Sequence, residues 1–445
     1  MDKFSSIIEK HVAPVANKVA RQRYIQALQS TFLSLIPFMT IGSFALIIIS
    51  PAADYKAMDA GMLRTFFQGW QSLADFTTVP LGLIYNISMG CMSLYVTAGL
   101  GLFLSKHYKL NNFITVLLTM ISFLIMSTVT KDGSISVQYF DGKGLFTSIL
   151  VSIITVELYR VMTNKRFGRI ELSGGGVPPA LTDSLAALAP AAVILLLMGV
   201  LSAVTLNLTG DAFPGVMTLI MTPLVGMIDS VWGVLILAVI VMLLWWFGIH
   251  DTVITGPLTP FLVTNFTANS AAYAAGTAAV SLPYILTEPF WWTFMAIGGS
   301  GATLGLAFLA LRSKSKQIRT VGKLCIIPSL FNINEPLIFG LPLMYNPVMM
   351  FPFIFTMALN GVVTYLAMDF HIIGRTFADP SWNMFAPIGA ILSTMDVKAL
   401  VLVIGLIIID VLIYLPFFKI YEKQKLEEEE NEENLEENHQ TALEE

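Results

Sequence analysis

The stretch "ALQSTFLSLIPFMTIGSFALIIIS", residues 27–50, contains no acidic or basic side chain. A transmembrane α-helix needs about 20 consecutive, predominantly apolar residues, and this stretch is longer than that. Two more stretches, between Asp75 and Lys106 and between Asp183 and Asp211, also carry no charged residue. The sequence therefore predicts several helices that cross a membrane.

The composition of the whole chain agrees with this prediction. Of 445 residues, 55% are hydrophobic and 12% are charged, whereas a soluble domain carries about 25% charged residues. Two cysteines, Cys91 and Cys325, are too few for a disulfide framework. Residues 1–26 lack the pattern of a cleavable signal, and their basic, amphipathic character predicts a helix on the membrane surface. The predicted fold class is an all-α polytopic membrane protein.

Nine stretches are candidate membrane spans. They cover residues 27–50, 80–104, 111–129, 144–162, 185–207, 230–249, 285–311, 343–367 and 398–418. Clusters of Lys and Arg precede the first span and follow the second, fourth and seventh, and such clusters mark the cytoplasmic side. The cytoplasmic positions of all these clusters are mutually consistent only if the chain crosses the membrane once more within residues 252–287. The sequence therefore predicts about ten transmembrane helices, with both termini in the cytoplasm.

The chain divides into five predicted regions. They are a surface helix (1–26), a helical scaffold expected to form a dimer (27–163 and 185–210), a linker (164–184), a transport domain (211–421) and an acidic tail (422–445). The tail holds eleven Glu and two Lys. Such a run is typical of a solvated segment, disordered or loosely helical, and docking of the tail to a partner is the alternative.

Three stretches in the second half are poor continuous helices. Residues 212–228 are short and contain two prolines, which predicts an interfacial helix. Residues 252–287 are uncharged but interrupted by Gly, Pro, Asn and Thr, which predicts a discontinuous crossing. Residues 324–342 are expected to form a re-entrant hairpin. Irregular backbone at membrane depth requires a protein or water-filled surrounding, so interrupted segments indicate a transport site.

The hairpin contains the first candidate residue for function. In "FNINEPLIFGLPLMYNP", residues 331–347, Glu335 lies between asparagines and a proline. An acid buried in the membrane is costly, which predicts a functional role in a cavity. The alternative is that Glu335 stabilises the positive end of the following helix. Asn332 and Asn334 are expected either to bind sugar hydroxyls or to hold the hairpin in shape.

A second candidate site lies at the end of an apolar span, in "LLWWFGIHDT". His250 and Asp251 follow Gly248 here, and Trp246 is expected to share a helical face with His250. A lone histidine is commonly a packed boundary residue, but with Glu335 it predicts a polar site. Trp245, Trp246, Trp291, Trp292 and Trp382 offer flat rings for a sugar face, although tryptophan also marks membrane interfaces.

Several enzyme motifs are absent from the sequence. It has no H-E-x-x-H zinc motif, no G-x-x-x-x-G-K-[ST] phosphate loop and no G-x-S-x-G elbow. The stretch "GGSGATLG", residues 298–305, is expected to lie within a span, where its Gly301 to Gly305 spacing predicts close helix packing. We therefore expect no metal, no cofactor and no ATP hydrolysis.

The motifs "FNINEPLIFGLPLMYNP" and "WWFGIHDT", with the basic amphipathic start, resemble the membrane-embedded IIC component of the bacterial phosphoenolpyruvate-dependent sugar phosphotransferase system. The branch that it resembles is that of lactose, cellobiose and N,N′-diacetylchitobiose, and the resemblance extends to about residue 421. It implies a homodimer in the bacterial inner membrane that moves a disaccharide by alternating access. It also implies a partner, the IIB protein with IIA upstream, and no nucleic acid.

The resemblance further implies the reaction at this site. A cysteine of the separate IIB protein would pass its phosphoryl group to the sugar 6-hydroxyl, with His250 and Glu335 holding that hydroxyl. General-base chemistry fits these residues, because a carboxylate or imidazole accepts the hydroxyl proton and fixes its direction. The alternative is a proton-coupled sugar symporter, in which both residues relay protons and the sugar leaves unmodified. The preferred disaccharide, cellobiose-type or N,N′-diacetylchitobiose, stays open here.

Overall fold

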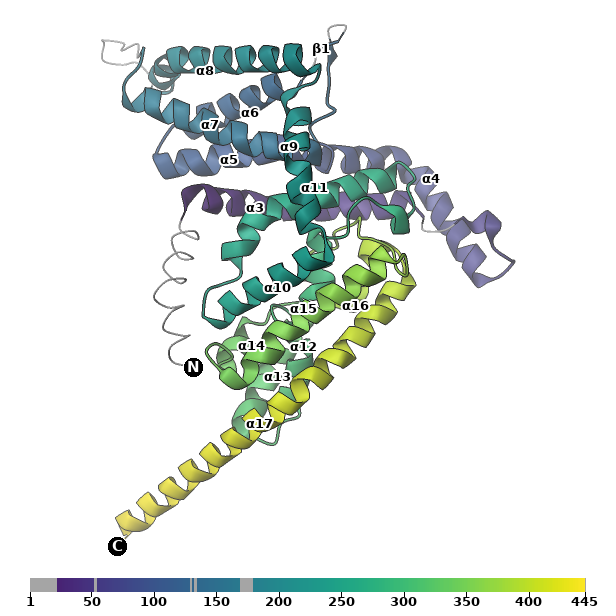
Figure 1. Ribbon diagram of the computed structural model, residues 1–445, viewed down its shortest axis with the longest axis vertical. Helices are drawn as coiled ribbons and strands as arrows, with labels where there is room; N and C mark the ends of the chain where they lie inside the picture. Colours follow the sequence, from purple (N-terminus) through teal and green to yellow (C-terminus); the bar gives the residue numbers. More distant parts are fainter. Residues whose placement is uncertain (1–21, 52–53, 129, 132–133, 169–178, 445) are drawn as a thin grey trace. The chain divides into compact units, whose positions relative to one another are not determined.

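The computed structural model describes residues 22–444, except 52–53, 129, 132–133 and 169–178. The described chain forms two compact units (Figure 1). We call Lys18–Met227 with Gly256–Ala275 the N-unit, and Ile228–Thr255 with Gly276–Glu445 the C-unit. The predicted surface helix, residues 1–26, lies almost entirely outside the described residues.

The N-unit is built from helices, with one short pairing of strands. Its elements are α3 (Arg23–Ile49), η2 (Tyr55–Ala57), α4 (Met62–Ser88), α5 (Met92–Tyr108), α6 (Asn112–Ser127), β1 (Thr130–Lys131), β2 (Ser134–Ile135), η3 (Gly142–Gly144), α7 (Leu145–Asn164), α8 (Pro179–Thr209), α9 (Phe213–Ile228) and most of α11 (Thr252–Ala274). The two strands pair antiparallel. Helices α5 to α8 lie side by side (Figure 1).

Small and hydroxyl side chains fill the contacts among α5, α6 and α7. The fully buried set is Ser93, Thr97, Ser105, Thr115, Thr119, Ser122, Ser127, Thr147, Ser148, Ser152 and Thr155. Gly101 of α5 faces Thr119 of α6 so closely that an added Cβ would overlap its hydroxyl. Small residues let helices approach within a membrane, where lipid removes the hydrophobic drive for association. The sequence of this bundle therefore favours tight packing in lipid.

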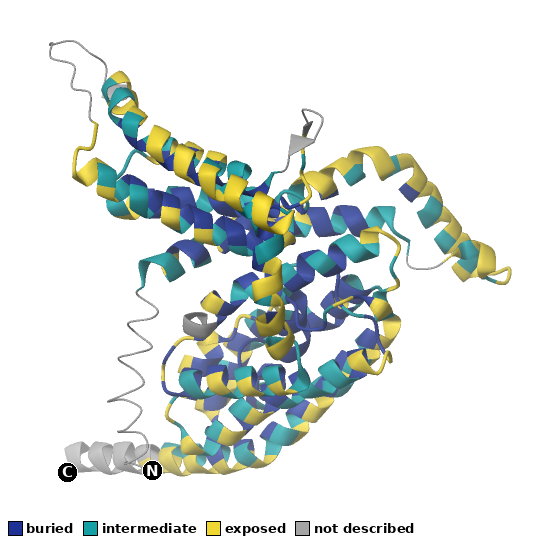
Figure 2. Cartoon of the chain, turned by 45° about the horizontal axis from the view of Figure 1, so that its top comes forward, coloured by how far each residue is buried: buried dark blue, intermediate teal, exposed yellow. Residues whose placement is uncertain are grey.

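The predicted span 80–104 is wrong as a single helix. The structure ends α4 at Ser88 and begins α5 at Met92, with a bend of 44° between them. Gly90 lies in the break, and glycine is a poor helix former. Helix α4 begins at Met62, well before the predicted start at residue 80. It buries only Ala74 and Tyr85, and Figure 2 shows it exposed over most of its length.

The C-unit contains several short and irregular helices. Its elements are α10 (Val231–Trp246), η4 (Ala279–Ser281), the π-helix η5 (Phe290–Met295), α12 (Leu304–Leu311), α13 (Lys316–Leu330), α14 (Glu335–Gly340), α15 (Pro347–Asp369), α16 (Ala386–Thr394) and α17 (Val397–Glu444). Helix α15 packs against α10 and α17. Helix α12 packs against α13 and α17.

The predicted span 285–311 is wrong as a continuous helix. It comprises the π-helix η5, a turn over residues 296–303 and then α12. Gly298, Gly299 and Gly301 have φ of +77°, +98° and +83°, a backbone conformation that glycine adopts without steric cost. Close packing is confirmed at Gly305, where a Cβ would lie 2.8 Å from the backbone nitrogen of Val411 in α17.

The predicted discontinuity within residues 252–287 begins later than expected. Helix α11 continues from Thr252 to Ala274 despite Pro257 and Pro260, and only the chain beyond it is irregular. Proline is tolerated in membrane helices because neighbouring groups satisfy the backbone carbonyls that it leaves free. The prolines alone therefore did not decide the local structure.

The acidic tail is helical as far as the structure describes it. Helix α17 runs from the last predicted span into the tail. The Glu422 carboxylate accepts hydrogen bonds from the Ser313 hydroxyl (2.5 Å) and the Lys314 backbone N–H (2.7 Å). The Glu429 carboxylate accepts hydrogen bonds from the Ser315 hydroxyl (2.7 Å) and from the backbone N–H groups of Lys316 and Gln317. The beginning of the tail thus docks within its own chain, at the start of α13.

The structure supports membrane insertion but leaves the number of crossings a prediction. Five described helices are long and apolar enough to cross a membrane, or seven if two bent helix pairs each count as one span. The boundary between the units also lies at other residues than the predicted domain boundary, because α9 and most of α11 group with the N-unit.

Candidate functional site

Residues 324–342 form the predicted hairpin of two helices joined by a turn, and its re-entry into the membrane stays a prediction. Helix α13 ends at Leu330, residues 331–334 turn, and α14 begins at Glu335 with Pro336 in its first turn. Asn332 has φ of +60°, a left-handed conformation that asparagine adopts more readily than most residues. The proline and the left-handed residue stop the helix and let the chain reverse.

The buried Asn332 side chain ties the hairpin to three other segments. Its Oδ1 accepts a hydrogen bond from the Gly298 backbone N–H at 2.8 Å. Its Nδ2 donates to the backbone carbonyls of Trp292 at 3.1 Å and Trp382 at 2.7 Å. Asn332 therefore joins the π-helix, the glycine turn and the loop before α16.

Asn334 fastens the hairpin to the glycine turn a second time. Its Nδ2 donates to the Ser300 carbonyl and to the Thr303 hydroxyl, both at 2.7 Å. Gly299 approaches this amide so closely that any Cβ would overlap the Asn334 side chain. Of the two roles left open for Asn332 and Asn334, these contacts favour holding the hairpin in shape.

His250 and Asp251 form a hydrogen-bonded pair at the end of α10. The His250 Nδ1 lies 2.9 Å from Asp251 Oδ1, and the other carboxylate oxygen accepts from the Ser300 hydroxyl at 2.6 Å. The Asp251 side chain is 6% exposed, whereas that of His250 is 48% exposed. Hydrogen bonding to Asp251 raises the pKa of His250, and the charge of Glu335 acts in the same direction. Asp251 is therefore placed to orient the imidazole.

The predicted pairing of His250 with Trp246 is wrong. Helix α10 ends at Trp246 and the chain reverses at Gly248, which has φ of +76°. The ring that contacts His250 is that of Trp245, with 4.6 Å between ring centroids. Trp246 instead donates its indole N–H to the Asn346 carbonyl at 2.9 Å. Both indoles are buried among other side chains of the protein, so neither presents an open face to a sugar in this structure.

The expectation that Glu335 is buried is wrong. It is exposed, as the first residue of α14, while the flanking Asn334 and Leu337 are buried. The physical reason is that the buried Asn332 and Asn334 side chains anchor the turn, which leaves the Glu335 carboxylate at its surface. The position also fits the alternative of an acid at a helix start. Its negative charge adds to the rise in the pKa of His250.

A half-buried pair of indoles completes the described site. The rings of Trp292 and Trp382 meet edge to face with 6.2 Å between centroids, and neither side chain is fully buried. Trp291, by contrast, is 1% exposed and belongs to the core. Sequence reasoning missed Ser300 and the positioning role of the glycine turn, for which the three closely spaced glycines were the available signal.

Broken helices that hold polar groups within an apolar α-helical protein are typical of membrane transporters. The chain belongs to the EIIC family of the phosphotransferase system, because the family model "Phosphotransferase system, EIIC" matches residues 29–356. It is a multi-pass membrane protein.

Relatives of known name match along nearly the whole chain. The Lichenan permease IIC component of Bacillus subtilis (strain 168) is 30% identical over 449 residues, which cover 96% of each chain. The PTS system cellobiose-specific EIIC component of Geobacillus stearothermophilus is 31% identical over 449 residues, again 96% of each. The solved structure of the transporter ChbC, the IIC component from the N,N′-diacetylchitobiose-specific phosphotransferase system, aligns with a TM-score of 0.86 at 29% identity, over 95% of this chain and 99% of that one.

Proposed function

We propose that the chain carries a cellobiose-type or N,N′-diacetylchitobiose-type disaccharide across the bacterial inner membrane and presents its 6-hydroxyl for phosphorylation. The observation that carries this proposal is the pair of exposed groups, His250 and Glu335, mounted on a buried network of asparagine, serine and aspartate contacts. Such a network fixes reacting groups in place before the substrate arrives, which is how positioning lowers a barrier.

The proposed chemistry divides the work between the two groups. The Glu335 carboxylate accepts the proton of the sugar 6-hydroxyl as the hydroxyl oxygen attacks phosphorus, and the P–S bond to the donor cysteine of IIB breaks to leave a thiolate. The imidazolium of His250, with Nδ1–H held by Asp251, donates a hydrogen bond to the 6-hydroxyl oxygen when the sugar binds. During transfer it donates to a phosphoryl oxygen instead and offsets the charge that develops there. Trp382 and Trp292 offer indole surfaces for a sugar ring.

The donor in this proposal is a phosphocysteine of a separate IIB protein, itself phosphorylated by IIA. Relatives named for lactose carry the label EIICB, and this chain covers 74% of one of them, from Staphylococcus aureus (strain N315). The names of the relatives for cellobiose, lichenan and N,N′-diacetylchitobiose support a disaccharide substrate. The proposal also includes a homodimer and cytoplasmic termini, the latter supported by the basic clusters beside the spans.

Asp251→Asn is expected to move the alkaline limit of sugar phosphorylation to lower pH. Asp251 raises the pKa of His250, so it extends the pH range in which the imidazole is charged. Removing the carboxylate lowers that pKa, and the donating imidazolium is then lost earlier as pH rises. The measurement is the phosphorylation rate across pH, with saturating sugar and phosphorylated IIB.

Ser300→Ala is the matched control for this variant. It removes one hydrogen bond to the Asp251 carboxylate but leaves the negative charge and the contact with His250. The pH limit should therefore stay closer to that of the native protein than in Asp251→Asn. An Asp251→Asn profile that superimposes on the native one would exclude the proposed role of the imidazolium.

The proposed function is tested by identifying the transported product. Vesicles that contain the protein would be given labelled cellobiose or diacetylchitobiose, with and without phosphorylated IIB. Sugar 6-phosphate that appears only with the partner is the expected result, and the relative rates rank the two sugars. Free sugar that accumulates with a proton gradient would replace this proposal by a symporter.

A further inference from the structure

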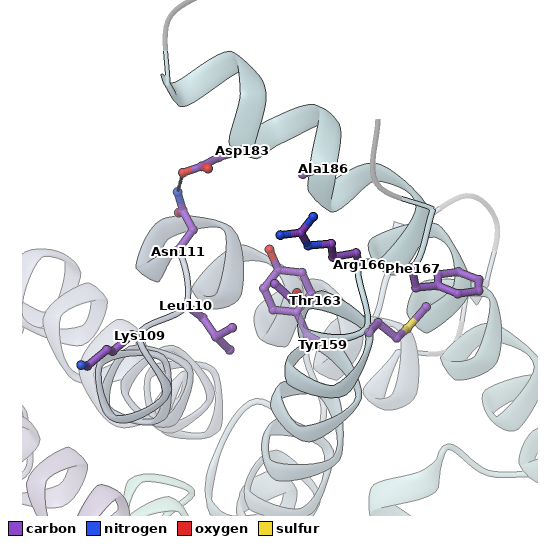
Figure 3. A pocket seen from close by; sticks show the side chains of 10 residues that line it. Lys109, Leu110, Asn111, Tyr159, Thr163, Arg166, Phe167, Asp183 and Ala186 are labelled. Carbon is purple, nitrogen blue, oxygen red and sulfur yellow. Dashed lines mark hydrogen bonds between the residues drawn. The ribbon is translucent and has the colours of Figure 1, made fainter. Parts of the chain in front are cut away.

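The N-unit contains a cavity of about 360 Å³ where α5 and α7 end and α6 and α8 begin. This volume lies in the range of small-ligand sites. Its lining is Lys109, Leu110, Asn111, Tyr159, Met162, Thr163, Arg166, Phe167, Asp183 and Ala186 (Figure 3). We propose that this cavity binds the phosphate group of an anionic phospholipid.

The polar half of the lining matches a phosphate. Figure 3 shows the Arg166 guanidinium extending over Tyr159 into the centre of the cavity, with Lys109 at its edge. A guanidinium can give a phosphate two parallel N–H bonds. Asp183, the acid of the lining, accepts a hydrogen bond from Asn111 at 3.0 Å.

Both cations occupy positions at which glycine would be the least strained choice. Lys109 and Arg166 follow the ends of α5 and α7 with φ of +55° and +51°. Helices commonly end in glycine at such left-handed positions. The chain keeps a long basic side chain at both, and both line the same cavity.

The rest of the cavity supports a rigid site with lipid beside it. Tyr159 is 4% exposed and belongs to a hydrophobic cluster that Leu110 and Met162 also contact. Phe167 is 49% exposed, and α8 exposes Leu181 (49%) and Leu188 (58%). Acyl chains can cover these apolar side chains, whereas free phosphate would make no use of them. Basic pockets between membrane helices bind anionic headgroups for the same reason.

The test is lipid retention by the full chain, purified without lipid and titrated with phosphatidylglycerol or phosphatidylcholine under native mass spectrometry. The protein should retain phosphatidylglycerol in preference to phosphatidylcholine. Arg166→Gln should weaken its binding about tenfold, as expected for a charged hydrogen bond, and Lys109→Gln should weaken it less. The control is Lys165→Gln, an exposed neighbouring cation outside the lining, which should change binding less than about twofold.

Three outcomes would overturn the inference. Lys109→Gln and Arg166→Gln could weaken binding no more than Lys165→Gln, phosphatidylcholine could bind as well as phosphatidylglycerol, or inorganic phosphate alone could bind with the same dependence on Arg166. If Arg166→Gln does not fold, as judged by size-exclusion chromatography, the comparison of Lys109→Gln with Lys165→Gln decides. None of these results depends on the proposed sugar transport.

Discussion

Replacing Glu335 by Gln is expected to slow sugar phosphorylation about 10²- to 10⁴-fold, the usual contribution of a positioned general base. Glutamine keeps the shape and hydrogen-bonding reach of the side chain but cannot take up the hydroxyl proton. Because Glu335 is exposed at the start of α14 and the buried asparagines hold the turn, the fold should not change. The measurement is the single-turnover rate from phosphorylated IIB to bound disaccharide.

Sugar binding separates loss of chemistry from loss of the site. The Kd for the disaccharide should stay within a few-fold of the native value in Glu335→Gln, because a group that acts in the transition state affects rate more than ground-state binding. Glu335→Asp, which keeps a carboxylate on a shorter side chain, should recover part of the rate. Full phosphorylation activity in Glu335→Gln at normal expression would refute the assigned role.

Gly299→Ala is expected to abolish disaccharide binding and to lower the thermal unfolding temperature. The residue has φ of +98°, which costs an L-residue about 1–3 kcal/mol. Its Cβ would also overlap the Asn334 side chain, so the contacts that fasten the hairpin to the glycine turn would break. Glu335 would then lose its fixed position. Binding of labelled disaccharide and the unfolding temperature in detergent are the two readouts.

Gly276→Ala is the matched control for the packing effect. Gly276 has a similar φ of +93°, but a Cβ there would meet no atom within 4 Å. It therefore carries the backbone strain without the overlap, and sugar binding should survive. Equal effects of the two substitutions would mean that the glycine turn matters only through backbone strain.

The sequence predicted the interrupted hairpin correctly because its signals are local. Pro336 cannot continue a preceding helix, and an asparagine at position 332 accommodates the left-handed turn. The same local signals failed for Pro257 and Pro260, which lie within the continuous helix α11. Whether a proline breaks a membrane helix depends on neighbours that satisfy the freed carbonyls, and sequence spacing does not reveal these neighbours.

The sequence singled out the residues of the candidate site but not the contacts between them. His250, Asp251 and Glu335 were found from polar residues in apolar surroundings. The contact of Trp245 with His250 was missed because helical periodicity was extended beyond Trp246, where the chain turns at Gly248. The link from Asp251 to Ser300 joins residues 49 positions apart, and no local pattern in one sequence predicts such a contact.

The central claim is that the reacting hydroxyl lies between His250 and Glu335, and a structure with disaccharide bound to Glu335→Gln tests it most directly. The account predicts the 6-hydroxyl oxygen within about 2.6–3.2 Å of both His250 Nε2 and the side-chain amide at position 335, with a sugar ring against Trp382 or Trp292. A disaccharide bound elsewhere, or with its 6-hydroxyl directed away from both residues, would contradict it.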